Sequence, residues 1–84
     1  MGLPKTTVYI LRSRSDPGRY YTGVTRNWRA RLQAHNDGLC THTARHRPWT
    51  IDVLVHFADE RRALAFERYL KSGSGCAFAR RHLR

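Results

Sequence analysis

The 84-residue chain has room for one domain with one modest core, so we expect a single domain over residues 1–84. Apolar residues make up 40% of the chain, which excludes a largely disordered protein. Sixteen Lys and Arg against six Asp and Glu give a net charge of +10, which favours a polyanionic partner such as nucleic acid. No segment pairs a long apolar face with a lysine-rich one, so we expect no membrane association.

The first residues and the cysteines bear on where the protein is found. Residues 1–5 do not have the pattern of a signal peptide. Cys40 and Cys76 lie far apart in the sequence and form no CxxC motif. We therefore expect a cytoplasmic protein with both thiols reduced.

Two strands joined by a turn are expected at the start of the chain. Residues 6–13 are β-branched and apolar, which favours a strand, and residues 14–18 contain the proline and glycine of a turn. Residues 19–24 return to β-branched and aromatic types, so the two segments predict a hairpin. The hairpin places Tyr9 and Tyr21 on neighbouring strands, although the pattern leaves their register open.

An arginine-rich helix is predicted to follow the hairpin. Asn27 is a favourable N-cap residue, and Asn36-Asp37-Gly38 is typical of a helix end. Arg31 and His35 are four residues apart, so their side chains leave one face of this helix about one turn apart. The polar and basic residues 39–48 have no clear period and predict a loop over the surface.

The alternation of residues 49–57 predicts a half-buried strand. Its buried face is expected to carry Ile51, Val53, Val55 and Phe57.

Two more helices are expected after this strand. Asp59 caps the first, whose apolar stripe contains Ala63, Phe66, Glu67 and Leu70. Residues 72–75 break it, and residues 76–83 predict a final short helix whose inward-facing residues are Ala77, Phe78 and Leu83. The order β-β-α-β-α-α predicts an α+β fold, with a three-stranded and mainly antiparallel sheet flanked by helices.

Two tripeptides on the hairpin carry a resemblance to a known family. Thr7-Val8-Tyr9 and Tyr21-Thr22-Gly23 resemble the two signatures of the GIY-YIG nucleases, with Thr-Val for Gly-Ile and Thr for the second Ile. Three further residues match the family's arginine, its helix-borne Tyr or His and its metal-binding glutamate: Arg31, His35 and Glu67. The resemblance covers about residues 6–83, and the chain is most similar to the small stand-alone bacterial branch.

The resemblance implies a metal-dependent phosphodiesterase, an endonuclease that cuts DNA by the attack of water. One of Tyr9 and Tyr21 would help to deprotonate the water and the other would orient it, and the sequence leaves open which does which. Arg31 would hold the scissile phosphate and stabilise the charge that grows on it. His35 either interacts with the carbonyl end of its helix or hydrogen-bonds the phosphate or a tyrosine hydroxyl.

Glu67 is the candidate metal ligand. A carboxylate on an apolar stripe is costly unless it is paired or binds a cation. One interpretation is an ion pair with an arginine; the other is a single Mg²⁺ or Mn²⁺ ion, completed by waters and substrate phosphate. Six acids in the whole chain argue against a two-metal cluster, and the spacing of Cys40, His42 and His46 matches no standard zinc site.

Nucleic-acid binding is expected to rest on six arginines, namely Arg26, Arg29, Arg45, Arg47, Arg80 and Arg81. Trp49 is assigned to the core rather than to base stacking. The C-terminal asparagine of many family members has no counterpart here, so either Ser72 or Ser74 replaces it or the site works less well. Two rivals stay open: a binding module with weak or lost catalysis, and a nuclease that acts on RNA. So small a domain is also expected to rely on a protein partner for specificity.

Overall fold

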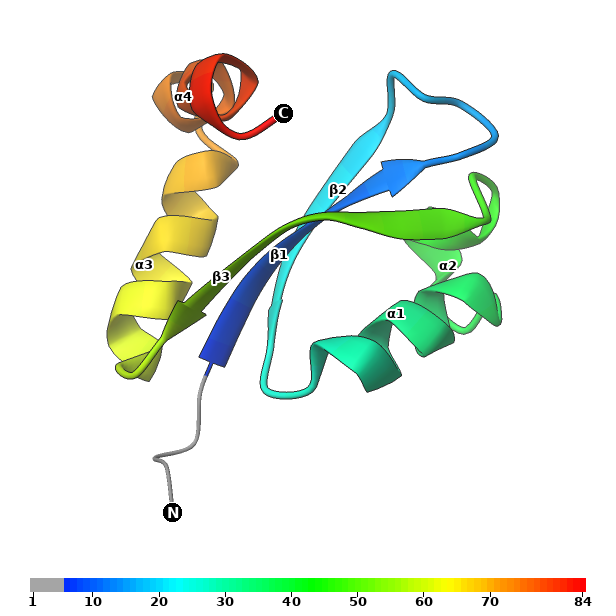
Figure 1. Cartoon of the computed structure of the whole chain (residues 1–84), viewed down its shortest axis with the longest axis horizontal. Coiled ribbons are helices and arrows are strands. Elements are labelled where there is room, and N and C mark those ends of the chain that lie inside the picture. The colour runs from blue at the N-terminus through cyan, green and yellow to red at the C-terminus, as the bar shows by residue number, and fades with distance from the viewer. Residues whose placement is uncertain (1–5) are drawn as a thin grey trace.

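The computed structural model describes residues 6–84, so the segment that bears on a signal peptide, residues 1–5, lies outside the described residues. In chain order the elements are β1 (Thr6–Ser13), β2 (Tyr20–Thr25), α1 (Trp28–Asn36), α2 (Thr41–Ala44), β3 (Trp49–Phe57), α3 (Glu60–Leu70) and α4 (Gly73–His82) (Figure 1). This order confirms the predicted α+β architecture and adds one short helix, α2.

The three strands form one antiparallel sheet in the order β2-β1-β3. Tyr9 lies opposite Gly23, and Leu11 lies opposite Tyr21. Because directly opposed residues of an antiparallel pair share a face, Tyr9 and Tyr21 lie on the same face as diagonal neighbours. The register that the pattern left open therefore brings the two tyrosines together.

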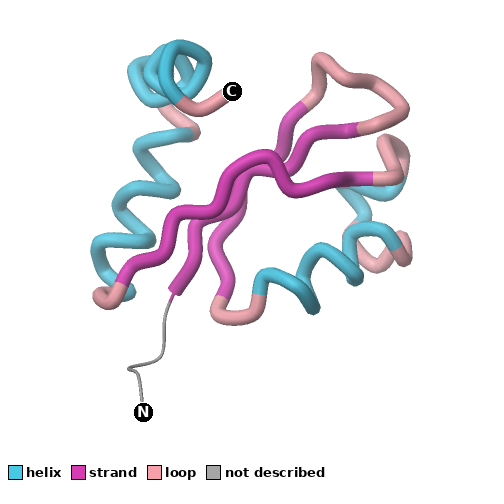
Figure 2. Tube along the Cα trace, viewed as in Figure 1, coloured by secondary structure: helices cyan, strands magenta, loops and turns pink. Residues whose placement is uncertain are grey.

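The helices cover opposite faces of the twisted sheet, with α1 and α2 on one side and α3 and α4 on the other (Figure 2). The face toward α1 buries Tyr9, Leu11 and Trp49, with Leu32 of α1 packed against them. The other face buries a second cluster, made of Val8, Ile10, Ala63, Leu70 and Ala79. β1 is thus the central strand of two small cores, which explains why six of its eight residues in a row are buried.

The expected alternation along β3 is wrong at one point. The pairing of β1 with β3 shifts between Ile10 and Leu11, where Ile10 lies opposite Val53 but Leu11 lies opposite Ile51. The extra residue on β3 moves Ile51 into the Tyr9 core, whereas Val53 packs in the other core. Four apolar residues with a period of two therefore do not share one face.

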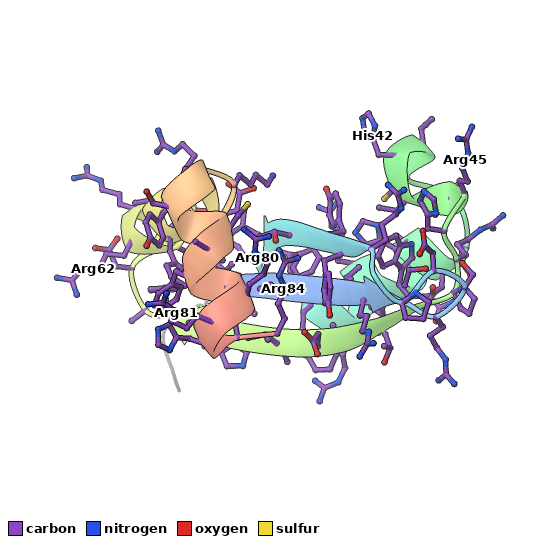
Figure 3. The ribbon with its side chains drawn as sticks, turned by 90° about the horizontal axis from the view of Figure 1, so that it is seen from above. His42, Arg45, Arg62, Arg80, Arg81 and Arg84 are labelled. Atoms are coloured by element: carbon purple, nitrogen blue, oxygen red, sulfur yellow. The ribbon has the colours of Figure 1, made fainter. Side chains whose placement is uncertain are left out.

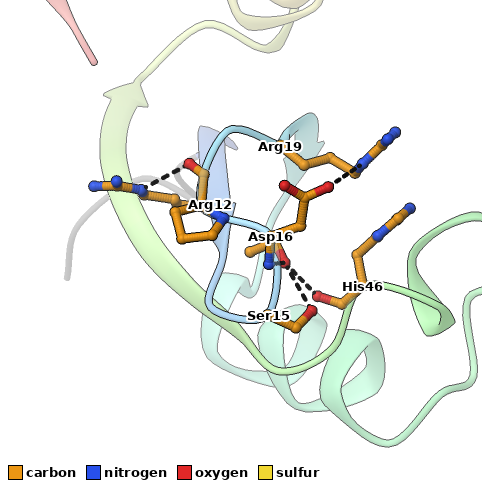
Figure 4. A network of polar contacts seen from close by, with 7 residues as sticks. Arg12, Ser15, Asp16, Arg19 and His46 are labelled. Atoms are coloured by element: carbon orange, nitrogen blue, oxygen red, sulfur yellow. Dashed lines mark hydrogen bonds and ion pairs between the residues drawn. The ribbon is translucent and has the colours of Figure 1, made fainter.

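The segment after α1 is more ordered than the expected surface loop. α2 makes one helical turn, and its Thr43 is only 1% exposed. The Ser13 hydroxyl donates to the His46 carbonyl at 2.7 Å and accepts from the Asp16 amide at 3.0 Å, which ties this segment to the β1–β2 turn (Figure 4). An exposed ion pair between Arg19 and Asp16 lies on the same turn.

The two C-terminal helices differ in detail from their predictions. α4 begins at Gly73 rather than Cys76, because the Ser72 hydroxyl accepts from the Gly75 amide and caps it. Gly75 lies against the backbone of Tyr69, where a Cβ atom would overlap the Tyr69 carbonyl. Phe78 and Leu83 pack against the core as expected, whereas Ala77 is exposed and Ala79 is buried in its place. Within residues 6–84 no helix combines the length and apolar character needed to cross a membrane.

Candidate active site

A chain of three buried polar side chains lies between β1, α1 and α2. The Tyr9 hydroxyl lies 3.0 Å from Nε2 of His35, and Nδ1 of His35 lies 2.7 Å from the Thr43 hydroxyl. Tyr9 is 3% exposed and His35 and Thr43 are each 1% exposed. Of the alternatives open for His35, the structure has the bond to a tyrosine hydroxyl, and its burial removes the imidazole from solvent contact.

Local structure explains why His35 points at Tyr9. Asn27 accepts from the Ala30 amide at 3.1 Å and starts α1, as the sequence predicts. At the other end, the Asn36 amide group accepts from the Trp49 backbone N–H at 2.6 Å and donates to the Trp49 carbonyl at 3.0 Å. These two bonds fix the last turn of α1 against β3, with His35 facing the sheet.

Gly23 makes room for the Tyr9 ring. A Cβ atom at Gly23 would overlap both the Tyr9 hydroxyl and its ring. Gly23 of the second tripeptide therefore leaves space for Tyr9 of the first, because the two residues lie opposite each other on neighbouring strands.

Tyr21 completes an aromatic group with Tyr9 and His35. Its ring centroid lies 5.0 Å from that of His35 and 6.3 Å from that of Tyr9. Burial raises the pKa of Tyr9 above its ordinary value, and the neighbouring Tyr21 adds to the rise while Arg31 opposes it. Burial and the charge of Arg31 lower the pKa of His35. Both groups are therefore neutral near pH 7.

Arg31 and Glu67 lie close enough to act on this group through their charges. Arg31 lowers the pKa of both Tyr9 and His35, and Glu67 raises that of Tyr9. The Arg31 side chain is exposed and makes no hydrogen bond or ion pair within residues 6–84. It is thus available to a phosphate, whereas no hydrogen bond joins Glu67 to the tyrosines in the described part of the chain.

Glu67 has a partner, but the partner is not the arginine considered from the sequence. Its Oε2 lies 2.6 Å from Nζ of Lys71, one turn further along α3. The Glu67 side chain is 15% exposed and that of Lys71 is 51% exposed. The carboxylate is therefore mostly buried, and its charge is paired with an ammonium group whose side chain is half exposed to solvent.

A pocket on the β2 side of α3 and α4 adjoins this site. It is lined by Tyr20, Tyr21, Thr22, Leu70, Lys71, Cys76, Ala79 and Arg84. Neither serine considered as a substitute for the missing asparagine lines it. The Ser72 hydroxyl donates to the Tyr69 carbonyl as well as capping α4, and Ser74 lines a different pocket with Phe78 and Arg81.

The six arginines that are expected to bind nucleic acid are all exposed. Arg26 pairs with Glu60 at 3.2 Å, Arg29 stacks on Trp28, and Arg47 donates to the Ala44 carbonyl. Arg45 lies at the α2 end of the molecule, and Arg80 and Arg81 lie at the α4 end (Figure 3). Trp49 is 4% exposed and its indole N–H donates to the Thr43 carbonyl, so it is a core residue as expected.

Sequence reasoning missed two residues that shape this site, Thr43 and Lys71, and did not foresee the contact of Gly23 with Tyr9. Thr43 lies in a stretch without periodicity, and nothing in the pattern marks it. The contact of Gly23 with Tyr9 depends on the strand register. Lys71, in contrast, has a signal, because it lies four residues after Glu67 on a helix.

Comparisons with known proteins show the family of the chain. The model of the GIY-YIG catalytic domain matches residues 5–76. A similar protein, the "Structure-specific endonuclease subunit SLX1" of Candida dubliniensis, is 40% identical over 83 residues, which cover 90% of this chain and 28% of that protein. The chain thus spans less than a third of the relative's length. Because the family model covers most of the chain, the protein belongs to the GIY-YIG catalytic domain family.

Proposed function

We propose that the protein is a divalent-metal-dependent endonuclease that hydrolyses phosphodiester bonds of DNA. The observation that carries the proposal is the buried pair of Tyr9 and His35, which lies beside Tyr21 and within the electrostatic reach of Arg31. Burying a phenol and an imidazole costs free energy unless the two groups are hydrogen-bonded to each other, as they are here. It is suited to moving a proton from an attacking water.

Tyr9 acts in this mechanism without becoming a phenolate. Because burial raises its pKa, the phenol is protonated at neutral pH. Its oxygen accepts a proton from the water as its own proton passes to Nε2 of His35, 3.0 Å away. The hydroxide attacks phosphorus as the bond to the leaving oxygen breaks, the leaving oxygen takes a proton from water, and buried His35 returns its own proton through the Tyr9 hydroxyl. Tyr21 contacts the same group and orients the water.

Arg31 stabilises the phosphate. Its exposed guanidinium can offer two parallel N–H groups to the phosphate oxygens, and it has no competing partner among residues 6–84. Positioned charge of this kind accounts for about 2.7–4 kcal/mol of the barrier in other hydrolases.

The residues present fit one hard cation held by Glu67. Its Oε2 faces Lys71 and has already given up part of its hydration, and no three His, Cys, Asp or Glu side chains gather among the described residues. Mg²⁺ commonly takes one or two carboxylates and completes its shell with waters and phosphate oxygens. Bound Mg²⁺ or Mn²⁺ would neutralise charge on the phosphate and on the leaving oxygen.

DNA is the substrate that we propose first. The relative is named a structure-specific endonuclease subunit, and the exposed arginines at the α2 and α4 ends offer two separated sets of phosphate contacts. We also propose that a protein partner supplies specificity and that the protein is cytoplasmic. RNA is the alternative substrate.

A second candidate function is nucleic-acid binding with weak or lost catalysis. The pairing of Glu67 with Lys71 favours it, since a paired carboxylate is a weaker metal ligand. The missing asparagine, which neither Ser72 nor Ser74 replaces in the pocket, points the same way.

The test is the conversion of supercoiled plasmid to nicked circles in Mg²⁺, Mn²⁺ or EDTA. We expect metal-dependent nicking that Glu67→Gln abolishes and that the matched variant Asp52→Asn, at an exposed carboxylate on β3, retains. Cleavage of a fluorescent RNA duplex, compared with that of a DNA duplex of equal length, tests RNA as the alternative substrate. DNA binding without nicking in either metal would leave the binding module as the function.

A further inference from the structure

We propose that Thr43 is a positioning residue that holds His35 in the tautomer with its proton on Nδ1. Its effect on turnover rests on the proposed nuclease function, whereas the tautomer itself is a property of the free protein. The inference concerns a residue in a stretch whose sequence carries no pattern, and it starts from the three buried side chains that join β1 to α2.

An account of the hydrogen atoms decides between the two neutral tautomers. With the proton on Nδ1, His35 donates to the Thr43 hydroxyl at 2.7 Å, Thr43 donates to the Cys40 carbonyl at 3.3 Å, and Tyr9 donates to Nε2 at 3.0 Å. Every donor hydrogen then has an acceptor. A buried network is stable only when each of its members is satisfied in this way.

The other tautomer leaves a hydrogen without an acceptor. With the proton on Nε2, His35 donates to the Tyr9 oxygen, and no other acceptor within residues 6–84 receives the Tyr9 hydroxyl hydrogen. An unpaired buried donor costs roughly 1–3 kcal/mol, enough to make this tautomer a minor species. The charged imidazolium is disfavoured too, since the surroundings of His35 are Tyr9, Tyr21 and the cation Arg31.

Thr43 itself is held rigidly enough to select a tautomer. Its carbonyl accepts from the Trp49 indole at 2.8 Å and from the His46 amide at 3.1 Å. Its own amide donates to the Cys40 carbonyl at 3.1 Å. These backbone bonds fix the hydroxyl oxygen beside Nδ1, where it accepts the Nδ1 hydrogen while its own hydrogen goes to the Cys40 carbonyl, as supporting groups of a functional imidazole commonly do.

The tautomer decides whether the proton path works. Only an unprotonated Nε2 can receive the Tyr9 proton while the Tyr9 oxygen accepts one from water. A protonated Nε2 would occupy the Tyr9 oxygen as a donor and block the path at its first step. Thr43 therefore acts through His35 and touches neither substrate nor metal.

The decisive measurement is the ¹⁵N spectrum of the histidine rings in the free protein at pH 8, with His35 assigned from the His35→Gln variant. We expect a protonated Nδ1 and an unprotonated Nε2 in the wild type and in Thr43→Ser, which keeps the hydroxyl. Thr43→Val should lose this pattern and give a mixture of tautomers. Thr41→Val is the matched control, because Thr41 is exposed on the same helix.

Turnover gives the second readout. Thr43→Val should lower kcat by about 10- to 100-fold, the usual cost of removing a partner that orients a functional histidine, with KM nearly unchanged. Thr43→Ser should restore most of the rate. A protonated Nε2 in the wild type overturns the proposal even if Thr43→Val does not fold. So does a Thr43→Val spectrum identical to that of the wild type. Absence of nicking in the wild type, with the expected spectrum, would refute the proposed function and leave the tautomer assignment standing.

Discussion

Substitution of Gly23 by alanine tests the contact on which the Tyr9 position depends. The new methyl would overlap the Tyr9 hydroxyl and ring, so the ring must move within a core that is almost fully closed. Overpacking of this kind costs roughly 1–3 kcal/mol. Loss of the buried bond to His35 adds roughly 1–3 kcal/mol, because it leaves the Tyr9 hydroxyl and Nε2 of His35 without a partner.

Gly18 supplies the matched control. A Cβ atom at Gly18 would meet nothing within 4 Å. Both substitutions reduce the freedom of the unfolded chain, by roughly 0.4–1 kcal/mol each, so this effect cancels when the two variants are compared. We therefore expect Gly23→Ala to have a free energy of unfolding about 2–6 kcal/mol below that of Gly18→Ala, from the sum of the packing and hydrogen-bond costs. That is a large fraction of the total for a small domain.

Urea unfolding followed by circular dichroism measures the free energy of unfolding of both variants. The cost of Gly23→Ala is then measured again in a protein that already carries Tyr9→Phe. In that background the hydroxyl and its bond are already gone, so Gly23→Ala should cost only the packing part. The coupling between the two substitutions should be roughly 1–3 kcal/mol, the cost of the lost bond. Equal unfolding free energies for Gly23→Ala and Gly18→Ala would refute the reasoning, and so would an equal cost of Gly23→Ala in both backgrounds.

Four further results are expected. In single-turnover kinetics, the nicking rate should fall by about 10²-fold or more in each of three variants, Tyr9→Phe, Tyr21→Phe and Arg31→Lys. The combined variant should lose far less than the product of the single losses, because the three residues act as one unit. Losses that multiply would show that the residues act independently. DNA affinity should fall with a log–log salt slope near −4 to −5 if about five phosphates are neutralised, and a flat slope would assign the basic surface to another partner. The lowered pKa of His35 means that the unfolded state binds more protons, so the free energy of unfolding should decrease as the pH falls below about 6.5. The raised pKa of Tyr9 has the opposite effect, so the free energy of unfolding should decrease as the pH rises above about 10, and Tyr9→Phe should remove this decrease. Urea unfolding at a series of pH values tests both effects.

The sequence alone determined the elements and their order, except for the short helix α2. β-branched runs, the Asn27 and Asp59 caps and the turn at residues 14–18 are local signals, and the structure has a strand, helix or turn at each. The spacing of Tyr9, Tyr21, Arg31, His35 and Glu67 along these elements also carried the family resemblance, which the family model confirms. Local propensity and side-chain spacing act within a few residues, so they can be read without knowing the fold.

Tertiary structure decided which side chains meet. The strand register placed Tyr9 over Gly23 and beside Tyr21, and the irregular pairing of β3 moved Ile51 to the other core. Thr43 met His35 because α2 packs against α1, although its segment has no readable pattern. Contacts between residues far apart in the chain depend on register and on close packing, and neither leaves a periodic trace in the sequence.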